Sequence, residues 1–356
     1  MPLPADLTAI PVIDVRGDGP IRHATEAGAR ALALRDECVS WLPRVAAGML
    51  PMMDLVTRRW LLRSPSPYAA ELQAIAGQLE LPGIWFLNGC YQWGCTARAS
   101  EQAGVPWLVR TLDWPFPGLG RRVEVAWMRG PAGEFHNVTW PGYVGVLTAS
   151  APGRFAASIN QAPMWRRTQS PWLRPYDIAL NAVYAWQIRA IPPDHLLRDV
   201  FETCETFVEA KHRLEVTPIA RPVIFTLVGC NAEERVVIER TERDYRTLDE
   251  DTCAANDWLL RRPSWEARVG ADALFTFSFE EAAKNSRRRS DHLAAWSSVF
   301  VGDFAWVSPP VLNSQTRVAV EMCPATGVLH AIGYECMDGE EFPQPATEIC
   351  QVAVAA

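Results

Sequence analysis

The spacing of hydrophobic residues divides the chain into helical and β-rich stretches. In the first of these, before residue 95, apolar positions such as Ala31, Leu34, Cys38 and Leu42 fall three and four apart, which is typical of helices. We expect helices over residues 22–62, 67–79, 84–91, 176–213, where Ile191-Pro192-Pro193 interrupts the pattern, and 279–298.

From residue 95 onward, short β-rich runs are separated by turns rich in glycine and proline. We expect strands over residues 95–100, 107–113, 122–128, 134–140, 143–149, 155–160, 223–228, 236–240, 247–255, 317–322 and 327–333. Runs that follow one another through short turns predict antiparallel pairing. The order of helices and strands predicts an α+β fold, in which two packed antiparallel sheets are covered by helices on both outer faces.

Charge and composition exclude several classes of protein. The 356 residues hold 34 Lys and Arg against 41 Asp and Glu, and no basic run resembles a nucleic-acid footprint. The first residues lack the features of a secretory signal, and no 18 apolar residues run together, so we expect a cytoplasmic protein without an integral membrane segment. The nine cysteines show no metal-type spacing, and we expect reduced thiols, no metal and no cofactor.

Cys95 is the first candidate for a catalytic residue. It stands at the start of one β-rich run, and the next run ends in Arg110 and Asp113. A hairpin would bring this thiol, the guanidinium and the carboxylate to one end, where the cation favours the reactive thiolate. A free cysteine is also often a small buried hydrophobe, and Arg110 and Asp113 would suit a surface cross-strand salt bridge. The spacing leaves these alternatives open.

A conventional cysteine enzyme needs a histidine as base, and none of the six histidines stands in a recognisable partner motif. We expect His195 and His292 to be solvated. The signatures of zinc peptidases, serine hydrolases and phosphate-binding loops are absent from the sequence. If the bond before Cys95 were cut, the new α-amine, with a pKa of about 8, could take the thiol proton.

Short motifs follow one another over roughly residues 65–335 in an order that resembles one family. They are Glu71-Leu72-Gln73-Ala74-Ile75-Ala76, Gly94-Cys95-Thr96, Arg110-Thr111-Leu112-Asp113, Gly142-Tyr143-Val144-Gly145, Ala157-Ser158-Ile159-Asn160, Val236-Val237-Ile238-Glu239-Arg240, Ala255-Asn256-Asp257-Trp258, Arg288-Arg289-Ser290 and Pro310-Val311-Leu312-Asn313. The ordered set resembles the acid ceramidase and N-acylethanolamine acid amidase group of N-terminal nucleophile (Ntn) hydrolases. Choloylglycine hydrolases and isopenicillin N acyltransferase are relatives of this group.

The resemblance implies an αββα four-layer sandwich made as a precursor. Cleavage between Gly94 and Cys95 would give a mainly helical segment, 1–94, and a catalytic domain, 95–356. The resemblance further implies a role for each motif residue: Cys95 as nucleophile toward an amide carbonyl, Arg110 beside the thiol, Asp113 holding the Cys95 amine, Asn256 and Asn160 as oxyanion donors, and Arg288 bracing Asn256 and the substrate.

The sequence departs from the family at positions that concern the substrate more than the nucleophile. Thr111 replaces an asparagine, Gln161 replaces the glutamate of the ceramidase group, and Ser286 and Arg287 replace two acids. Aromatic residues flank the motifs and would wall a pocket for an apolar acyl group, although most tryptophans are core residues. The candidate substrate contacts are Trp114, Tyr143, Trp165 and Trp258. The apolar run 49–53 is either buried or touches lipid.

Three hypotheses follow for the function. The first is a self-processing cysteine amidase that hydrolyses a linear N-acyl amide, a small-molecule substrate, through an acyl-enzyme thioester. The second keeps the thioester but passes the acyl group to an amine. The third is an uncleaved, non-catalytic binding protein in which the thiol of Cys95 is merely buried.

Overall fold

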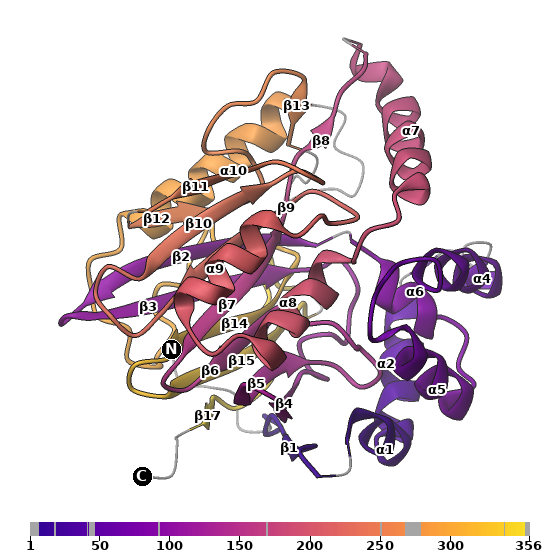
Figure 1. Cartoon of the computed structure of the whole chain (residues 1–356), viewed down its shortest axis with the longest axis horizontal. Coiled ribbons are helices and arrows are strands. Elements are labelled where there is room, and N and C mark those ends of the chain that lie inside the picture. The colour runs from indigo at the N-terminus through magenta and orange to yellow at the C-terminus, as the bar shows by residue number, and fades with distance from the viewer. Residues whose placement is uncertain are drawn as a thin grey trace.

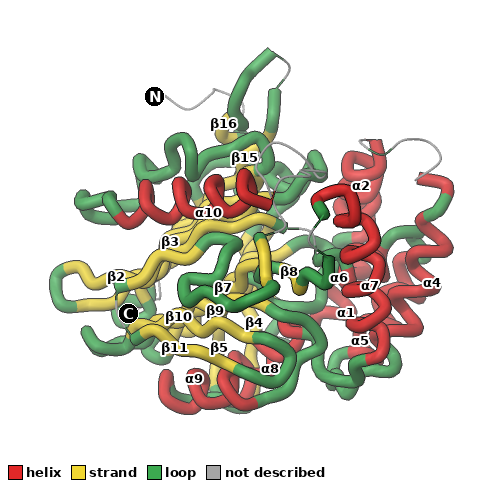
Figure 2. The backbone as a smooth tube through the Cα atoms, turned by 90° about the horizontal axis from the view of Figure 1, so that it is seen from above, coloured by secondary structure: helices red, strands yellow, loops and turns green. Residues whose placement is uncertain are grey.

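The computed structural model describes residues 7–17, 19–40, 42, 47–91, 93–168, 170–249, 251–267, 279–337 and 339–352. Two large β-sheets lie face to face at its centre, with helices on both outer sides, as Figures 1 and 2 show. This is the αββα sandwich that the sequence predicted.

The first sheet has eight strands. Their order across the sheet is β1 (Val12–Asp14), β4 (Glu124–Gly130), β5 (Gly133–Thr139), β6 (Thr148–Ala151), β7 (Phe155–Gln161), β9 (Val223–Val228), β10 (Arg235–Arg240) and β11 (Tyr245–Leu248). All of these neighbours pair antiparallel except β1, which lies parallel to β4. The sequence reading missed β1, because three residues are too short for a visible alternation.

The second sheet has seven strands and carries the predicted nucleophile. Its order is β12 (Thr252–Ala254), β2 (Gly94–Gln102), β3 (Val105–Asp113), β14 (Thr316–Cys323), β15 (Val328–Glu335) and β16 (Gln344–Pro345), with β17 (Cys350–Val352) also paired to β15. A two-stranded pair, β8 (Met164–Trp165) and β13 (Trp265–Glu266), stands apart from both sheets.

Helices form the two outer layers and one end of the sandwich. The eight-stranded sheet is covered by α8 (Pro193–Thr203) and α9 (Phe207–Val216), and the other sheet by α10 (Phe279–Ala294). The N-terminal helices gather at one end, beside the sheets: α1 (Gly19–Glu26), α2 (Gly28–Ser40), α4 (Leu50–Leu61), α5 (Ala69–Leu79) and α6 (Ile84–Gly89). A 3₁₀ turn, η1 (Pro171–Leu173), leads into α7 (Arg174–Gln187), which extends from one edge in Figure 1.

The β2–β3 hairpin positions the nucleophile. Ala103 and Gly104 adopt left-handed conformations, with φ of 52° and 82°, and close the tight turn. The hairpin register pairs Cys95 with Leu112 and Gly94 with Asp113. Because side chains alternate along a strand, Cys95 shares a face with Ala97 and Ala99, and all three are fully buried.

Several predicted boundaries are wrong. The single helical stretch 22–62 is divided, and its first break falls at Ala27, directly before Gly28, a poor helix former. The helical stretch 176–213 has a second break at Cys204, after which the Thr206 hydroxyl caps α9 by accepting an N–H from Glu209. The expected strand 247–255 is two strands in different sheets. The strand expected over 143–149 reaches only Thr148 and Ala149, at the start of β6.

The proposed division at residue 94 stays a prediction. In the intact chain the two parts share a sheet, because β1 from the first part pairs with β4 from the second. Tyr91, four residues before Cys95, donates its hydroxyl to Asp194 on α8 at 2.5 Å. Segment 1–94 is thus packed against the rest by backbone and side-chain contacts.

Candidate active site

The Cys95 thiol lies between the two sheets against the guanidinium of Arg110. Arg110 donates from Nη2 to Cys95 Sγ at 2.7 Å, and Sγ also faces the main-chain oxygen of Ile159 at 3.6 Å. Cross-strand register explains the contact, because Arg110 pairs with Ala97 and therefore points to the same face as Cys95. The predicted juxtaposition of thiol and guanidinium is present.

Burial and charge act in opposite directions on this thiol. Both Cys95 and Arg110 are fully buried. Burial raises the pKa of Cys95 to about 11, while the Arg110 charge, as the next largest influence, lowers it. Arg110 also donates to the Leu147 main-chain oxygen at 2.9 Å and to the Thr148 hydroxyl. The thiol of the intact chain therefore stays protonated at neutral pH and needs a base to react.

Asp113 lies on the opposite face of the same sheet. It stands three residues after Arg110 on β3, so the two side chains point in opposite directions. Its carboxylate is 2% exposed and accepts hydrogen bonds from Asn313 and Thr316, each at 3.0 Å. The expected alternative of a surface salt bridge between Arg110 and Asp113 is wrong, because both are buried on different faces and no such ion pair forms among the described residues.

Asn256 bridges the nucleophile to its surroundings. Its Oδ1 accepts the main-chain N–H of Cys95 at 2.9 Å, and its Nδ2 donates to the Gln161 main-chain oxygen at 2.9 Å. These two contacts fix the amide orientation. The second Nδ2 hydrogen has no acceptor among the described residues, so it can donate to a reacting carbonyl. The intact-chain N–H of Cys95 thus contacts Asn256, and a contact between a free Cys95 amine and Asp113 stays a prediction.

The arginine that braces Asn256 is Arg289, and the prediction of Arg288 for this position is wrong. Arg289 is 1% exposed and donates to Asn256 Oδ1 at 2.8 Å, to the Cys95 main-chain oxygen at 2.6 Å and to Thr96 Oγ1 at 2.8 Å. Arg288 is exposed to solvent. The helical period decides between them, because Arg289 shares the buried face of α10 with Ala282 and Leu293.

Asn160 has another task in the intact chain. Both hydrogens of its Nδ2 are used, by the main-chain oxygens of Ala254 at 3.0 Å and Ala255 at 3.1 Å. The side chain therefore links β7 to the strand that leads into Asn256. The Asn160 side chain therefore has no hydrogen left to donate to an oxyanion in this arrangement. A contact through its backbone stays a prediction.

The four predicted substrate contacts are dispersed. Trp114 is fully buried and packs against Trp93 and Trp140. Tyr143 is buried and donates its hydroxyl to Asp194 at 2.9 Å, which makes it part of the core. Trp165 on β8 is 41% exposed, with the Arg167 guanidinium 4.8 Å from its ring centre. Trp258 follows Asn256 by two residues and lines a cavity with Trp265 and Arg262.

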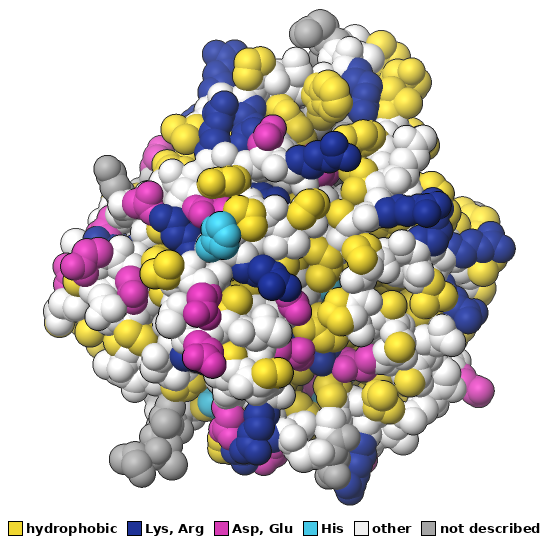
Figure 3. All heavy atoms as spheres, in the orientation of Figure 1, with side chains coloured by type: hydrophobic (Ala, Val, Ile, Leu, Met, Phe, Trp, Pro, Cys, Tyr) yellow, Lys and Arg dark blue, Asp and Glu magenta, His cyan; other side chains and the backbone are white. Residues whose placement is uncertain are grey.

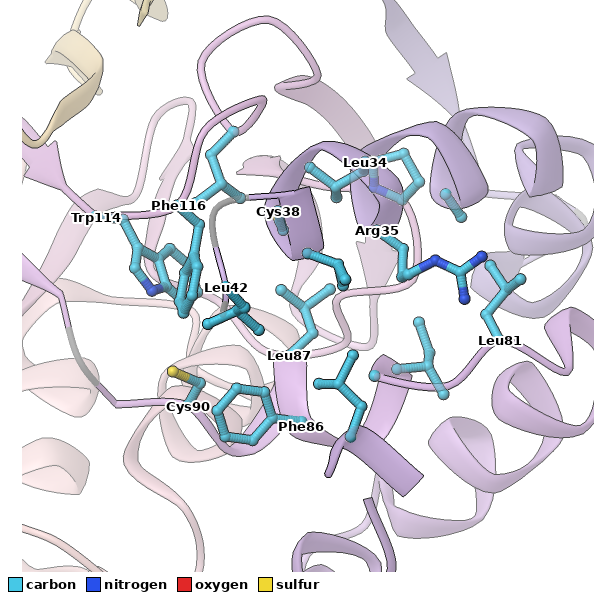
Figure 4. A pocket seen from close by; sticks show the side chains of 17 residues that line it. Leu34, Arg35, Cys38, Leu42, Leu81, Phe86, Leu87, Cys90, Trp114 and Phe116 are labelled. Carbon is cyan, nitrogen blue, oxygen red and sulfur yellow. The ribbon is translucent and has the colours of Figure 1, made fainter. Parts of the chain in front are cut away.

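An apolar cavity of about 60 Å³ lies between the N-terminal helices and the segment after β3, as Figure 4 shows. Trp114 and Phe116 form one side, and Leu34, Leu87 and Cys90 face them. Trp114 directly follows Asp113, and Cys90 precedes Cys95 by five residues. These lining residues are thus neighbours of Asp113 and Cys95 in the sequence, while Cys95 itself does not line the cavity.

Sequence reasoning missed or misjudged other residues. His195 is fully buried against Ser66 rather than solvated, while His292 is exposed as expected. Ser286 accepts the Asn256 main-chain N–H at 2.8 Å, a contact that its identity alone could not reveal. Helical spacing from Ala282 to Leu293 could have indicated Arg289. Among the described residues, no group of histidine, cysteine or acidic side chains is arranged to hold a metal ion.

The two-sheet sandwich, with Cys95 near the start of β2, agrees with the fold that the motifs predicted. The N-acylethanolamine-hydrolyzing acid amidase of Oryctolagus cuniculus is 30% identical over 183 residues, 49% of this chain and 48% of that protein. The Mus musculus amidase is 27% identical over 205 residues, 55% and 53% of the two chains. The chain is thus a relative of these amidases, which confirms the resemblance stated from its motifs.

Two further comparisons complete these findings. A probable acid ceramidase of Caenorhabditis elegans is 23% identical over 295 residues, 76% of this chain and 70% of that protein. A solved structure of a Caenorhabditis elegans N-acylethanolamine-hydrolyzing acid amidase ortholog superposes with a TM-score of 0.48 and 17% identity, over 65% of this chain and 93% of that one. No family model matches the chain. The chain spans about half the length of the curated amidases it matches.

Proposed function

We propose that this protein is a self-processing cysteine amidase that hydrolyses a linear N-acyl amide with an apolar acyl group. The observation that carries the proposal is the pair of contacts at the nucleophile: Arg110 against the Cys95 sulfur at 2.7 Å and Asn256 against the Cys95 nitrogen at 2.9 Å. A thiol with a cation beside it, and a carboxamide that holds the nitrogen of the same residue, are parts that acyl transfer needs. The relationship to amidases and ceramidases supports the same reaction class.

The first step is cleavage of the chain itself. Cys95 Sγ attacks the Gly94 carbonyl carbon, the bond from that carbon to the Cys95 nitrogen breaks, and the nitrogen takes the thiol proton. Water then hydrolyses the thioester, which leaves a carboxylate on Gly94 and returns the thiol. Asn256 holds the Cys95 nitrogen through this step, and Arg110 stabilises the negative charge that develops on sulfur.

The same groups then act on the substrate. The free Cys95 amine takes the thiol proton, sulfur attacks the amide carbonyl, and the amine returns the proton to the leaving nitrogen. The second Nδ2 hydrogen of Asn256 donates to the oxyanion, a contact worth about 3 kcal/mol or 10²–10³ in rate in comparable sites. Water hydrolyses the acyl-enzyme thioester. The apolar cavity beside Trp114 and Cys90 supports an apolar acyl group.

Mass spectrometry of the purified protein tests self-cleavage. We expect two fragments, residues 1–94 and 95–356, and a single uncleaved chain for Cys95→Ala. Hydrolysis is measured with fluorogenic N-acyl amides of varied acyl length, with Cys253→Ala as the control, because Cys253 is a buried cysteine with no part in the proposed reaction. A Cys95→Ala protein that is cleaved and active would refute the proposal.

One observation favours the non-catalytic alternative, in which the chain is never cleaved. The Cys95 side chain is fully buried in the intact chain, so no substrate reaches the sulfur in this state. The amidase proposal requires that cleavage at Gly94 opens the site. Wild-type protein that stays in one piece across pH 4 to 8, with no hydrolysis, would establish the binding-protein alternative instead.

We propose that the surface formed by α4 and α7 contacts lipid. Exposed apolar side chains gather there, with Arg58 and Arg59 beside them: Met49, Met52, Leu55, Val56, Leu62, Trp172, Leu173, Tyr176, Ile178, Val183 and Tyr184. Trp60 joins the two helices by donating to the Ala185 main-chain oxygen at 3.1 Å. Figure 3 shows yellow and dark-blue side chains together over this side. Apolar residues mixed with cations are typical of helices that lie in a membrane interface.

Vesicle flotation tests this contact. We expect binding to vesicles that contain anionic lipid, and loss of binding in the double variant Leu55→Ser, Val56→Ser. Val208→Ser is the control, because Val208 is even more exposed than Leu55 and Val56 but lies on α9. Within the described residues, none of the helices has the length and apolarity needed to cross a bilayer. A cytoplasmic location stays part of the proposal, and cell fractionation tests it.

A further inference from the structure

Asp113 is held by a short loop that none of the proposed chemical steps uses. Thr316 donates its hydroxyl to Asp113 Oδ1 at 3.0 Å, and Asn313 donates from Nδ2 to Oδ2 at 3.0 Å. Asn313 and Thr316 are 6% and 0% exposed. The loop leads into β14, whose first residue, Thr316, pairs with Asp113 across the sheet. Each oxygen of the buried carboxylate thus has a donor of its own.

The orientation of the Asn313 carboxamide is determined by its other contacts. Its Oδ1 accepts the Gln315 main-chain N–H at 3.0 Å, so Nδ2 must face Asp113. The remaining Nδ2 hydrogen reaches the Val311 main-chain oxygen at 3.1 Å. The Asn313 main-chain N–H in turn donates to Thr316 Oγ1 at 3.0 Å. Every polar atom of this carboxamide is used, and the side chain can present only a donor to Asp113.

Asp113 connects this loop to the nucleophile through Arg289. Among the described residues, it is the only carboxylate within ion-pair distance of Arg289, with Nη1 3.4 Å from Oδ2. The same guanidinium holds Asn256 Oδ1 and the Cys95 main-chain oxygen. In the part of the chain that the structure describes, the charged group that contacts Asp113 is Arg289 from α10, while the Cys95 thiol lies on the other face of the sheet. A continuous series of contacts therefore runs from Asn313 through Asp113 and Arg289 to Asn256.

We propose that Asn313 is a positioning residue of this site: its Nδ2 holds the Asp113 carboxylate on Arg289, and Arg289 thereby keeps Asn256 Nδ2 turned toward the reacting carbonyl. The role of Asn256 in turnover rests on the proposed function, while the contacts among Asn313, Asp113 and Arg289 stand independently of it. Asn313 itself touches no substrate. Its replacement should therefore lower kcat and leave KM unchanged.

The variant Asn313→Asp tests this with almost no change of shape. It puts a carboxyl group where Nδ2 stands, 3.0 Å from the Asp113 carboxylate. Two carboxylates this close share one proton, and the pKa of the pair rises above the usual value of about 4. While that proton is present it can replace the lost donor. As the pH rises through the raised pKa, the pair becomes doubly charged and the contact is lost.

The experiment compares Asn313→Asp with the parent enzyme between pH 4.5 and 7.5 on one N-acyl amide. We expect the ratio of variant to parent kcat to fall at least about tenfold over this range, which corresponds to about 1.4 kcal/mol, with KM unchanged. The control Asn313→Leu removes the donor without adding a titratable group, and its kcat ratio should be low at every pH. A ratio for Asn313→Asp that does not change with pH would overturn the inference.

A second measurement separates this inference from the proposed function. Asn313→Asp is introduced into the Cys95→Ala chain, because this measurement needs no enzyme activity. The Cys95→Ala chain is then unfolded with urea both with and without Asn313→Asp. The difference in the free energy of unfolding between these two proteins should widen from pH 4.5 to 7.5. The reason is that a carboxyl pair whose pKa is raised in the folded state loses its stabilising contribution as the pH rises. A constant difference, or a variant unfolded at both pH values, would overturn the contacts. Inactive wild-type protein with a widening difference refutes only the proposed function.

Discussion

Replacing Arg289 and Arg288 in turn tests which of the two arginines holds Asn256, because the structure places Arg289 there and the sequence predicted Arg288. Arg289→Ala removes a buried guanidinium that donates to Cys95, Thr96 and Asn256 at 2.6 to 2.8 Å. It also leaves the Asp113 carboxylate buried without its cation. Removing one partner of a buried pair typically costs about 3–5 kcal/mol, a large share of a total stability of about 5–15 kcal/mol. Arg288→Ala changes an exposed side chain and should stay within about 0.5 kcal/mol of wild type.

The stability assay uses the Cys95→Ala chain, so that all variants remain in one piece. Urea unfolding followed by fluorescence gives the free energy of unfolding for Arg289→Ala, Arg289→Lys and Arg288→Ala. We expect Arg289→Lys to fall between the others, because one ammonium keeps the charge but cannot reach all the partners of a planar fork. In the active background, Arg289→Ala should also lose about 10²-fold or more in kcat, since Asn256 is no longer oriented.

The result that would refute this reasoning is a similar effect of the two alanine variants. Equal stability losses would mean that the Arg289 guanidinium is no more buried than that of Arg288. A larger loss for Arg288→Ala would mean that α10 is rotated by one residue relative to the arrangement described. A stable and fully active Arg289→Ala protein would mean that Asn256 is oriented without help, and the series of contacts from Asp113 to Asn256 would then have no role.

Three further predictions concern residues whose surroundings decide their role. Burial raises the pKa of Cys95 to about 11 and shields its sulfur, so in the Asn256→Ala chain, which we expect to stay uncleaved, iodoacetamide should alkylate Cys95 slowly at pH 7; rapid labelling of Cys95 at pH 7 would contradict this. Tyr143→Phe should lower the free energy of unfolding by about 1–3 kcal/mol and leave KM unchanged, because the hydroxyl donates a hydrogen bond to Asp194. A changed KM with unchanged stability would instead show that Tyr143 contacts the substrate. Trp165→Ala should raise KM and leave urea unfolding almost unchanged, since the ring is 41% exposed; a large stability loss would place it in the core.

Much of the fold could be predicted because its signals are local. The runs that became β2, β3, β7, β9, β14 and β15 alternate or are continuously apolar between clear turns, and Ala103-Gly104 indicated the hairpin that carries Cys95. Where the local signal was ambiguous, the prediction failed. Residues 247–255 were predicted as one strand, yet Asp249 and Asp251 lie between its two halves, which join different sheets.

The residues of the candidate site could also be predicted only where their signals are local. Cys95 and Arg110 could be placed together from the sequence, because pairing the two strands through their short turn puts both side chains on the same face. The same period of two, applied to Asp113, would have sent it to the other face. Asn256 could be identified only through the family resemblance, because 161 positions separate it from the nucleophile whose nitrogen it contacts.

The sequence by itself determined the layered architecture and the hairpin that pairs the thiol with a guanidinium, because periods of 2 and 3.6 residues are properties of neighbouring positions. Only the tertiary structure decided that Arg289, and not Arg288, reaches the site, that Asp113 is held by Asn313 and Thr316, and that Tyr143 belongs to the core. These outcomes depend on the rotation of α10 against the second sheet and on which strands become neighbours. Packing of the whole chain sets both, and no short stretch of residues contains that information.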